Sequence, residues 1–292
     1  RFIGAGRGQW YTADAPYTTF HGSFDQKVYN RKLGNGFLGV GGALNYDRSG
    51  DSRLALIQIN LSGSYSYLLD DENILTGGLM LGAGQRSFDM ADLRWGSQHN
   101  GELYNATTSS GENFNESGYI YPDFGLGVNY RAQKTGKRTH LDIGVAAFHL
   151  HRPNQSFDEQ GVSKLQPKYS IYANQLYQLR PKLDFYLNGL AQLQDKYFEG
   201  VIGAGGRFHL DQRRGKELAL QAGLAYRLNE IGDAAILAAE VHYQNWRLGL
   251  SYDINVSEYR IASNRNGGPE VTLRHIIAFI KPIPVFKICP II

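Results

Sequence analysis

The sequence lacks the features that mark several large classes of protein. It contains one cysteine, Cys289, so it can form neither an internal disulfide nor a cysteine-based metal site. It has no run of 18 or more apolar residues, which excludes a membrane-spanning helix. It also has no basic run interleaved with aromatics, so we expect no nucleic-acid partner. No cofactor motif stands out, and we expect no cofactor.

What is abundant points to β-structure. The 292 residues include 35 Gly, 19 Tyr and 14 Phe but only 9 Pro, a mixture that suits strands with close backbone approach and aromatic belts. No helical spacing of apolar residues is sustained. We expect one all-β domain over residues 1–292. Because the chain opens at Arg1 in strand-like sequence, we expect a leader to have been processed or trimmed.

Strict alternation of apolar and polar residues is the strongest signal. It is clearest in 57–67, 124–131, 218–228 and 246–255. A water-soluble sandwich also alternates, but its outer faces usually carry Thr, Lys and Glu. Here the polar face is rich in Gly, Ser and Asn with interspersed Arg and acids, and the apolar face is nearly free of charge. This composition favours a barrel with a crowded polar lumen and a lipid-facing exterior over the sandwich.

Counting strands gives an all-β, 14-stranded antiparallel transmembrane β-barrel of a bacterial outer membrane. Connections after even-numbered strands are short, and every long connection (90–118, 151–167 and 256–269) follows an odd-numbered strand. This asymmetry predicts short periplasmic turns and long extracellular loops. The predicted strands lie near 2–10, 18–29, 36–46, 53–68, 74–89, 119–132, 139–150, 168–178, 183–194, 198–210, 217–228, 234–242, 246–255 and 270–280.

Charge and aromatic residues follow the same asymmetry. The short connections carry ten basic residues against four acids: Arg31, Lys32, Lys134, Lys137, Arg138, Arg180, Lys182, Arg213, Arg214 and Lys216. Outward aromatics gather near both strand ends, as expected where rings sit at the two membrane interfaces.

Charged residues also occur on the face predicted to line the lumen. Both signs are interleaved, so they either pair with one another across a narrow or plugged lumen or form a selectivity path for ions or solutes. The predicted lumen charges are Arg86, Arg131, Asp142, Asp184, Glu199, Arg207, Arg227, Glu240, Arg247, Asp253 and Arg274.

The long loops are candidates for partner binding. Loop 90–118 keeps large aromatics among polar residues, which either anchor a partner or fold the loop onto itself or into the lumen. Loops 151–167 and 256–269 would line the same rim. The candidate partner-binding residues of this rim are Trp95, Tyr104, Phe114, Tyr119, Phe157 and Tyr259.

Apparent catalytic and ligand motifs have simpler explanations. Gly203–Arg207 resembles a phosphate-binding loop, but strand-like sequence follows it, so we expect small residues in a barrel wall. His149 and His151 could share a strand face and bind a metal, yet no third ligand is apparent, so a strand-end or loop-base role is favoured and no metal is expected. No Gly-x-Ser-x-Gly elbow is present. We expect that the protein is not an enzyme.

Several segments resemble the PorP/SprF family, the outer-membrane barrels associated with type IX secretion and gliding motility in Bacteroidota. The segments are Trp246–Asn255, Asn266–Leu273, Cys289-Pro290, Tyr17–Asp25 and Gly36–Gly42. The chain departs from the family in lacking an Asn-Pro-Ala-like segment ahead of the first strand. It also ends in Ile291-Ile292 where family members tend to end in an aromatic residue.

The resemblance implies a role in protein transport rather than a catalytic site. Such barrels are thought to help export or retain large surface adhesins that carry a C-terminal sorting domain. The implied partners are that cargo domain, the type IX translocon, the periplasmic ring components and the lipid bilayer. Two other functions remain open from the sequence: a passive or selective outer-membrane porin, and an adhesive barrel whose loops bind host or cell-wall ligands.

Overall fold

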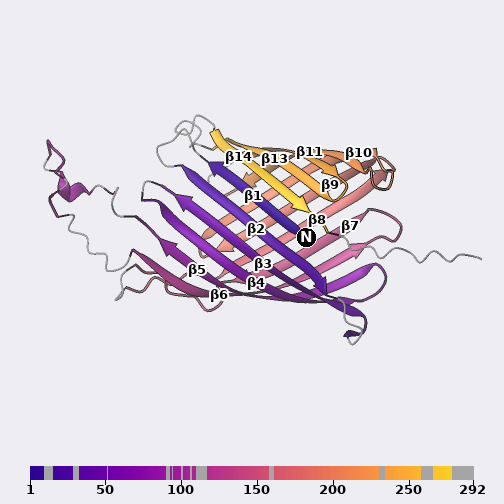
Figure 1. Cartoon of the computed structure of the whole chain (residues 1–292), viewed down its shortest axis with the longest axis horizontal. Helices are drawn as coiled ribbons and strands as arrows, with labels where there is room; N and C mark the ends of the chain where they lie inside the picture. Colours follow the sequence, from indigo (N-terminus) through magenta and orange to yellow (C-terminus); the bar gives the residue numbers. More distant parts are fainter. Residues whose placement is uncertain are drawn as a thin grey trace, which may run out of the picture.

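The computed structural model is a closed barrel of antiparallel strands, β1 to β14, in which each strand pairs with its neighbours in sequence (Figure 1). The structure describes residues 1–277 apart from 10–15, 29–32, 51, 90–92, 94, 100, 106, 110–116, 158–160, 230–233 and 258–265. The strands are β1 Phe2–Gln9, β2 Tyr17–Val28, β3 Gly36–Ser49, β4 Leu54–Leu68, β5 Asn73–Ser87, β6 Gly118–Gln133, β7 His140–Phe148, β8 Lys168–Arg180, β9 Leu183–Gln194, β10 Tyr197–Asp211, β11 Leu218–Leu228, β12 Ala234–Tyr243, β13 Trp246–Asn255 and β14 Asn266–His275.

The first and last strands close the barrel. β1 pairs with β14, with Phe2 opposite His275 and Arg7 opposite Glu270. Closure leaves no strand edge with unpaired backbone groups, which is what a sheet needs in order to cross a bilayer. The 14-stranded antiparallel barrel expected from the alternation is confirmed. Among the described residues, no helix is long and apolar enough to cross a membrane.

Strand boundaries agree with the prediction within three residues, except in the last strand. The prediction placed it at 270–280, but β14 begins at Asn266 and ends at His275. Gly267, Gly268 and Pro269 had been read as part of the preceding loop. In the structure Pro269 lies opposite Tyr252 within the ladder. Gly268 has a φ of +150°, and a Cβ there would collide with the backbone oxygen of Gly8. The third long connection therefore covers 256–265 rather than 256–269.

The two ends of the barrel differ as predicted. Short connections follow β2, β4, β6, β8, β10 and β12 at one end, which we call the turn end; the other end, which carries the connections 88–117, 149–167 and 256–265, is the loop end. In the β4–β5 turn the carboxylate of Asp70 accepts hydrogen bonds from the backbone N–H groups of Glu72 and Asn73, each at 2.8 Å. The side-chain amide of Asn73 is the main cause of the lowered pKa of Asp70.

The barrel wall is apolar outside and polar inside. Leu79 is 67% exposed and Leu224 is 64% exposed, whereas Asp184 is fully buried and Asp123 is 2% exposed. A water-soluble protein shows the reverse, because it buries apolar side chains and exposes charged ones. The barrel therefore presents its apolar surface to lipid and collects its polar groups in the lumen.

Candidate functional site in the lumen and at the loop end

A polar cavity occupies the lumen. It has a volume of about 600 Å³ and is lined by side chains from β1 and from β6 to β14, which face one another across the barrel. We call it the lumen cavity. Six of the predicted lumen charges line it: Arg131, Asp142, Arg207, Glu240, Arg247 and Arg274.

At the turn end, the cluster around the buried carboxylate of Asp184 joins two connections and strand β10. Arg138, between β6 and β7, donates to it from Nε and Nη2 at 2.8–3.1 Å, and His209 on β10 lies 2.7 Å from Oδ2. Arg138 also donates from Nη2 to the carbonyl of Pro181 at 2.8 Å in the β8–β9 turn. A fully buried carboxylate needs such partners, so this cluster fixes the turn end rather than leaving a charge for a ligand.

In the lumen close to the turn end, ion pairs alternate with arginines that form no ion pair with a described residue. Arg131 lies 3.6 Å from Asp142, and His242 lies 2.8 Å from Glu240. Arg207 donates from Nε to Gln221 at 2.8 Å. Arg247 and Arg274 make no ion pair within the part of the chain that the structure describes.

At the loop end, Asp253 joins three strands. Its carboxylate binds Arg7 on β1 and Arg227 on β11, the latter at 2.7 Å. On the opposite side of the barrel, Asp123 on β6 accepts a hydrogen bond from His149 at 2.9 Å. Because Asp253 and Asp123 are both almost fully buried, these pairs stabilise the lumen wall close to the loops.

Three lumen tyrosines lie against glycines on neighbouring strands. A Cβ at Gly205 or Gly223 would collide with the ring of Tyr186, while Gly84 faces Tyr121 and Gly144 faces Tyr172 in the same way. The ring fills the space that a side chain on the neighbouring strand would otherwise occupy. The glycines of 203–207 thus serve the barrel wall, as the strand-like sequence after them indicated, and do not form a phosphate-binding loop.

Part of the second long loop packs against the lumen wall. The ring of Phe157 makes edge contacts with Tyr119 on β6 at 4.9 Å and with Phe88 at 4.8 Å. Gln155 accepts a hydrogen bond from Arg86 on β5 at 3.0 Å. Two of the predicted rim residues, Tyr119 and Phe157, are therefore brought together, and Arg86 binds a loop residue rather than an acid.

The first long loop contains a short 3-10 helix, η2 Gly96–Gln98, which projects well beyond the strand ends (Figure 1). Trp95 donates its backbone N–H to the side chain of Gln98 at 3.1 Å, and the hydroxyl of Tyr104 donates to the same oxygen at 3.3 Å. These contacts join Trp95 and Tyr104 in one local structure separate from Tyr119 and Phe157. The predicted residues Phe114 and Tyr259 lie outside the described residues.

The two histidines considered as metal ligands do not share a strand face. β7 ends at Phe148, and His149 adopts a positive φ of +57°. Its ring binds Asp123, whereas the ring of His151 contacts Phe124 at 4.9 Å. No group of three or more metal-ligating side chains occurs among the described residues.

The structure places six of the eleven predicted lumen charges in the lining of the lumen cavity, and some partners of the others were not predicted. Glu199 lies on the same strand face as Arg207 and is exposed, and it makes no ion pair with any described residue. Arg7, Asp123 and His209 were missed. All three lie inside the predicted strands and on their inward face, so applying the alternation along each whole strand would have found them.

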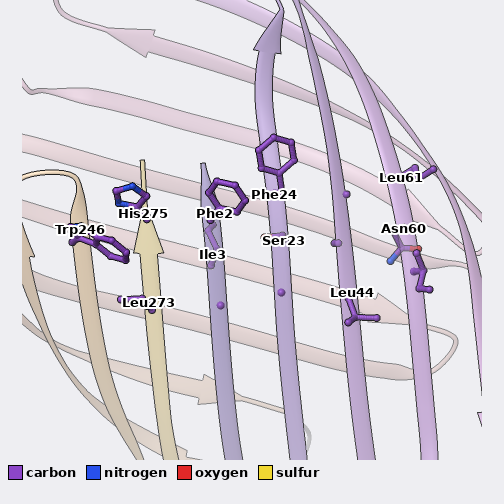
Figure 2. Close-up of a pocket in the computed structure, with 15 residues that line it drawn as sticks. Phe2, Ile3, Ser23, Phe24, Leu44, Asn60, Leu61, Trp246, Leu273 and His275 are labelled. Atoms are coloured by element: carbon purple, nitrogen blue, oxygen red, sulfur yellow. The ribbon is translucent and has the colours of Figure 1, made fainter. Parts of the chain in front are cut away.

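A groove lies on the opposite, lipid-facing side of the wall. It has a volume of about 750 Å³ and runs across β13, β14 and β1 to β4. Figure 2 shows Trp246 beside His275 and Phe2 beside Phe24; the ring centroids are 4.0 Å and 4.8 Å apart. At Gly4 an added Cβ would meet nothing within 4 Å, so the missing side chain hollows the surface.

Comparison with solved structures supports the architecture. The chain is similar to a FadL homologue of Pseudomonas aeruginosa, with a TM-score of 0.53 and 12% identity over 93% of this chain and 88% of that one. It is also similar to the monoaromatic hydrocarbon channel CymD, with a TM-score of 0.51 and 12% identity over 95% and 88% of the two chains. At such low identity these likenesses concern the fold alone.

Comparison with protein families gives the identity. No curated protein sequence matches the chain. The family described as "Type IX secretion system membrane protein PorP/SprF" matches residues 1–275, which include all fourteen strands. The resemblance seen in the sequence is confirmed: the chain is an outer-membrane β-barrel that belongs to the PorP/SprF family of type IX secretion.

Proposed function

We propose that this barrel helps to export or anchor large surface adhesins through their C-terminal sorting domain, in contact with the type IX translocon and the periplasmic ring components. The observation that carries the proposal is the family match over residues 1–275. The role requires no catalytic step, and we propose that the protein is not an enzyme.

The loop end is the proposed site of contact with the sorting domain. The helix η2 projects beyond the strands, and Trp95 and Tyr104 are hydrogen-bonded to its residue Gln98. The exposed fraction of Tyr104 is 39%. Aromatic side chains supply much of the binding energy at protein interfaces because they bury a large area at small entropic cost. The basic turn end would face the machinery in the periplasm, where Lys134, Lys137 and Arg213 attract acidic partner surfaces.

The proposal is tested by changing the loop aromatics while the barrel remains intact. The double variant Trp95→Ala/Tyr104→Ala should lose most cargo display and co-purification, and Ser97→Ala/Thr108→Ala is the matched control in the same segment. Each barrel is first shown to be folded by its heat-sensitive migration in gel electrophoresis. Unchanged cargo capture by the aromatic variant would exclude this loop as the contact.

The turn end is tested separately. Reversing the charge of Lys134, Lys137 and Arg213 to Glu should weaken co-purification of periplasmic machinery by about tenfold or more, because each basic residue attracts acidic partners. Retained binding after reversal would remove the turn end from the proposal. Arg138 is left unchanged because it is needed by Asp184.

The second candidate function is a selective outer-membrane channel. The observation that favours it is the lumen cavity of about 600 Å³ with its charged lining. The FadL homologue and CymD share the barrel architecture, and the latter is described as a monoaromatic hydrocarbon channel. Reconstitution in planar bilayers distinguishes the two functions: a steady open conductance from the pure barrel supports the channel, and its absence supports the secretion role.

A further inference from the structure

Two arginines lie directly opposite each other on neighbouring strands of the lumen wall. Arg247 on β13 is the register partner of Arg274 on β14, and both line the lumen cavity. Like charges in directly opposite positions repel and destabilise a sheet. Neither arginine makes an ion pair with any described residue, so no direct partner among these residues offsets the repulsion.

A third arginine faces the same space. Arg207 on β10 lines the cavity and donates from Nε to the neutral side chain of Gln221 at 2.8 Å. It too has no acidic side chain within ion-pair distance in the part of the chain that is described. Three guanidinium groups thus converge on one cavity from three strands.

The acids that line the cavity are already engaged. Asp142 pairs with Arg131 at 3.6 Å, and Glu240 lies 2.8 Å from His242. Asp184 lies opposite Arg207 in the ladder, but its carboxylate pairs with Arg138. Even when the whole charge of Glu240 is counted against Arg207, Arg247 and Arg274, an excess of two positive charges remains among these described residues. The remaining cavity arginine, Arg1, binds Asp25.

The cavity has room for a ligand beside these groups. At Gly249, between Glu240 and Thr272 in the ladder, a Cβ would collide with the Thr272 hydroxyl, so the glycine keeps that oxygen accessible. The Nε of Arg274 is shielded from solvent and has no hydrogen-bond acceptor among the described residues. A volume of about 600 Å³ lies within the range of small-molecule sites.

We propose that the lumen cavity binds a small oxyanion with two or more negative charges, held by Arg207, Arg247 and Arg274. Guanidinium groups match the geometry of carboxylate and phosphate oxygens, to which they donate two parallel hydrogen bonds. The bound anion neutralises the opposed arginines and accepts the hydrogen bonds that the wall leaves unsatisfied. This site does not include the loop and turn residues proposed for secretion. The anion-binding proposal can therefore be wrong while the secretion role is right, and the secretion role can be wrong while the anion site is right.

The test uses the purified full-length barrel, folded in a non-ionic detergent at low salt. Calorimetric titrations with citrate, inorganic pyrophosphate and acetate compare multivalent carboxylate, multivalent phosphate and a monovalent control. Citrate or pyrophosphate should bind with 1:1 stoichiometry and at least tenfold more tightly than acetate. Binding of only one of the two also supports the site and shows which oxyanion it prefers.

Variants separate this site from general attraction to a basic protein. Arg247→Gln and Arg274→Gln should each weaken binding by about tenfold or more, because each removes a charge-assisted contact. Arg214→Gln, in the exposed β10–β11 turn, should leave binding unchanged. Thermal unfolding gives a second readout. Citrate or pyrophosphate should raise the unfolding temperature of the wild type and not that of the double variant Arg247→Gln/Arg274→Gln.

Several results overturn the proposal. It fails if neither citrate nor pyrophosphate binds, or if the cavity variants bind as tightly as the wild type. It also fails if an acidic peptide binds while both small anions do not, since the site would then recognise a protein segment. A variant that does not fold is detected by gel migration before titration. Arg274→Lys, which keeps the charge but loses the paired N–H donors, then replaces Arg274→Gln and should also bind the anion more weakly than the wild type.

Discussion

Arg138 holds the carboxylate of Asp184 through Nε and Nη2, although the two residues lie 46 positions apart and on different hairpins. The side chain of Asp184 is fully buried, while that of Arg138 is 34% exposed. The pair, with His209, ties the β6–β7 connection to the β8–β9 hairpin. A carboxylate with this little access to water depends on its partner to remain charged.

Breaking this pair should destabilise the turn end. Arg138→Lys keeps the charge but loses the two-nitrogen fork, and Asp184→Asn keeps the shape but loses the charge. We expect Asp184→Asn to lower the free energy of unfolding by about 3 kcal/mol, the value for a buried pair that loses one partner. Arg138→Lys should lower it by about 2 kcal/mol, because the charge remains while a hydrogen bond to the buried carboxylate is lost. Urea titration of the folded barrel in vesicles measures this change.

The exposed pair Arg213–Asp211 gives the matched control. The side chain of Arg213 is 75% exposed. Arg213→Lys should change the free energy of unfolding by no more than about 1 kcal/mol, since exposed ion pairs contribute little. If Arg138→Lys lowered the free energy of unfolding no more than this control does, the Arg138–Asp184 pair would not stabilise the barrel.

The contact between Tyr172 and Gly144 makes a second prediction. Gly144→Val should destabilise the barrel by about 1–3 kcal/mol, because the new side chain meets the tyrosine ring and overpacks the wall. Adding Tyr172→Ala should recover part of this loss by opening the space. A double-mutant cycle measured by urea unfolding gives the coupling, and purely additive effects would show that the ring does not lie over the glycine.

The sequence was sufficient for the architecture because alternation is a local property. Each of 57–67 and 246–255 carries its two faces within a single strand, and the order of short and long connections then fixes the hairpin ends. The final strand was misplaced because Gly267, Gly268 and Pro269 have the composition of a turn. Only the tertiary position of Gly8, against which Gly268 packs, explains why they lie in a strand.

The pairings in the lumen were less predictable for a physical reason. Alternation shows that Asp253 and Arg227 face inward, but their contact depends on the stagger between strands and on side-chain length. Contacts made by loop residues are harder still to predict, because loops have no regular alternation. Nothing in the spacing of Arg86 and Gln155 indicates that one binds the other across 69 positions.

The charge of Asp253 should be needed to stabilise the barrel where β1 pairs with β14, which we call the seam. Asp253→Asn leaves Arg7 on the closing strand β1 and Arg227 on β11 without their shared carboxylate. We expect a loss of about 3–5 kcal/mol in the free energy of unfolding, typical of a buried charge that loses its partner. Asp253→Glu should be milder than Asn.

Hydrogen exchange locates the effect of that change. Amides of β1 and β14 should exchange faster in Asp253→Asn than in the wild type, since Arg7 would no longer be anchored to β13. Amides of β4, which has no part in this ion cluster, serve as the internal control. Uniform acceleration across the barrel would instead indicate a global effect and contradict a local role at the seam.

The contact of Phe157 with Phe88 and Tyr119 should control how firmly the second long loop lies against the lumen wall. Phe157→Ala removes two edge-on ring contacts, each of which contributes about 0.5–1.5 kcal/mol. A loss of about 2 kcal/mol would raise the population of the undocked loop roughly thirtyfold. The amides of Gln155 and Leu165, which donate to Ser163 and Pro153 within the loop, should then exchange faster by a similar factor. Val162→Ala, at a residue of the same loop that is 76% exposed, should leave these rates unchanged. Equal rates in the wild type and Phe157→Ala would mean that Arg86 and the loop backbone hold the loop without the aromatic contacts.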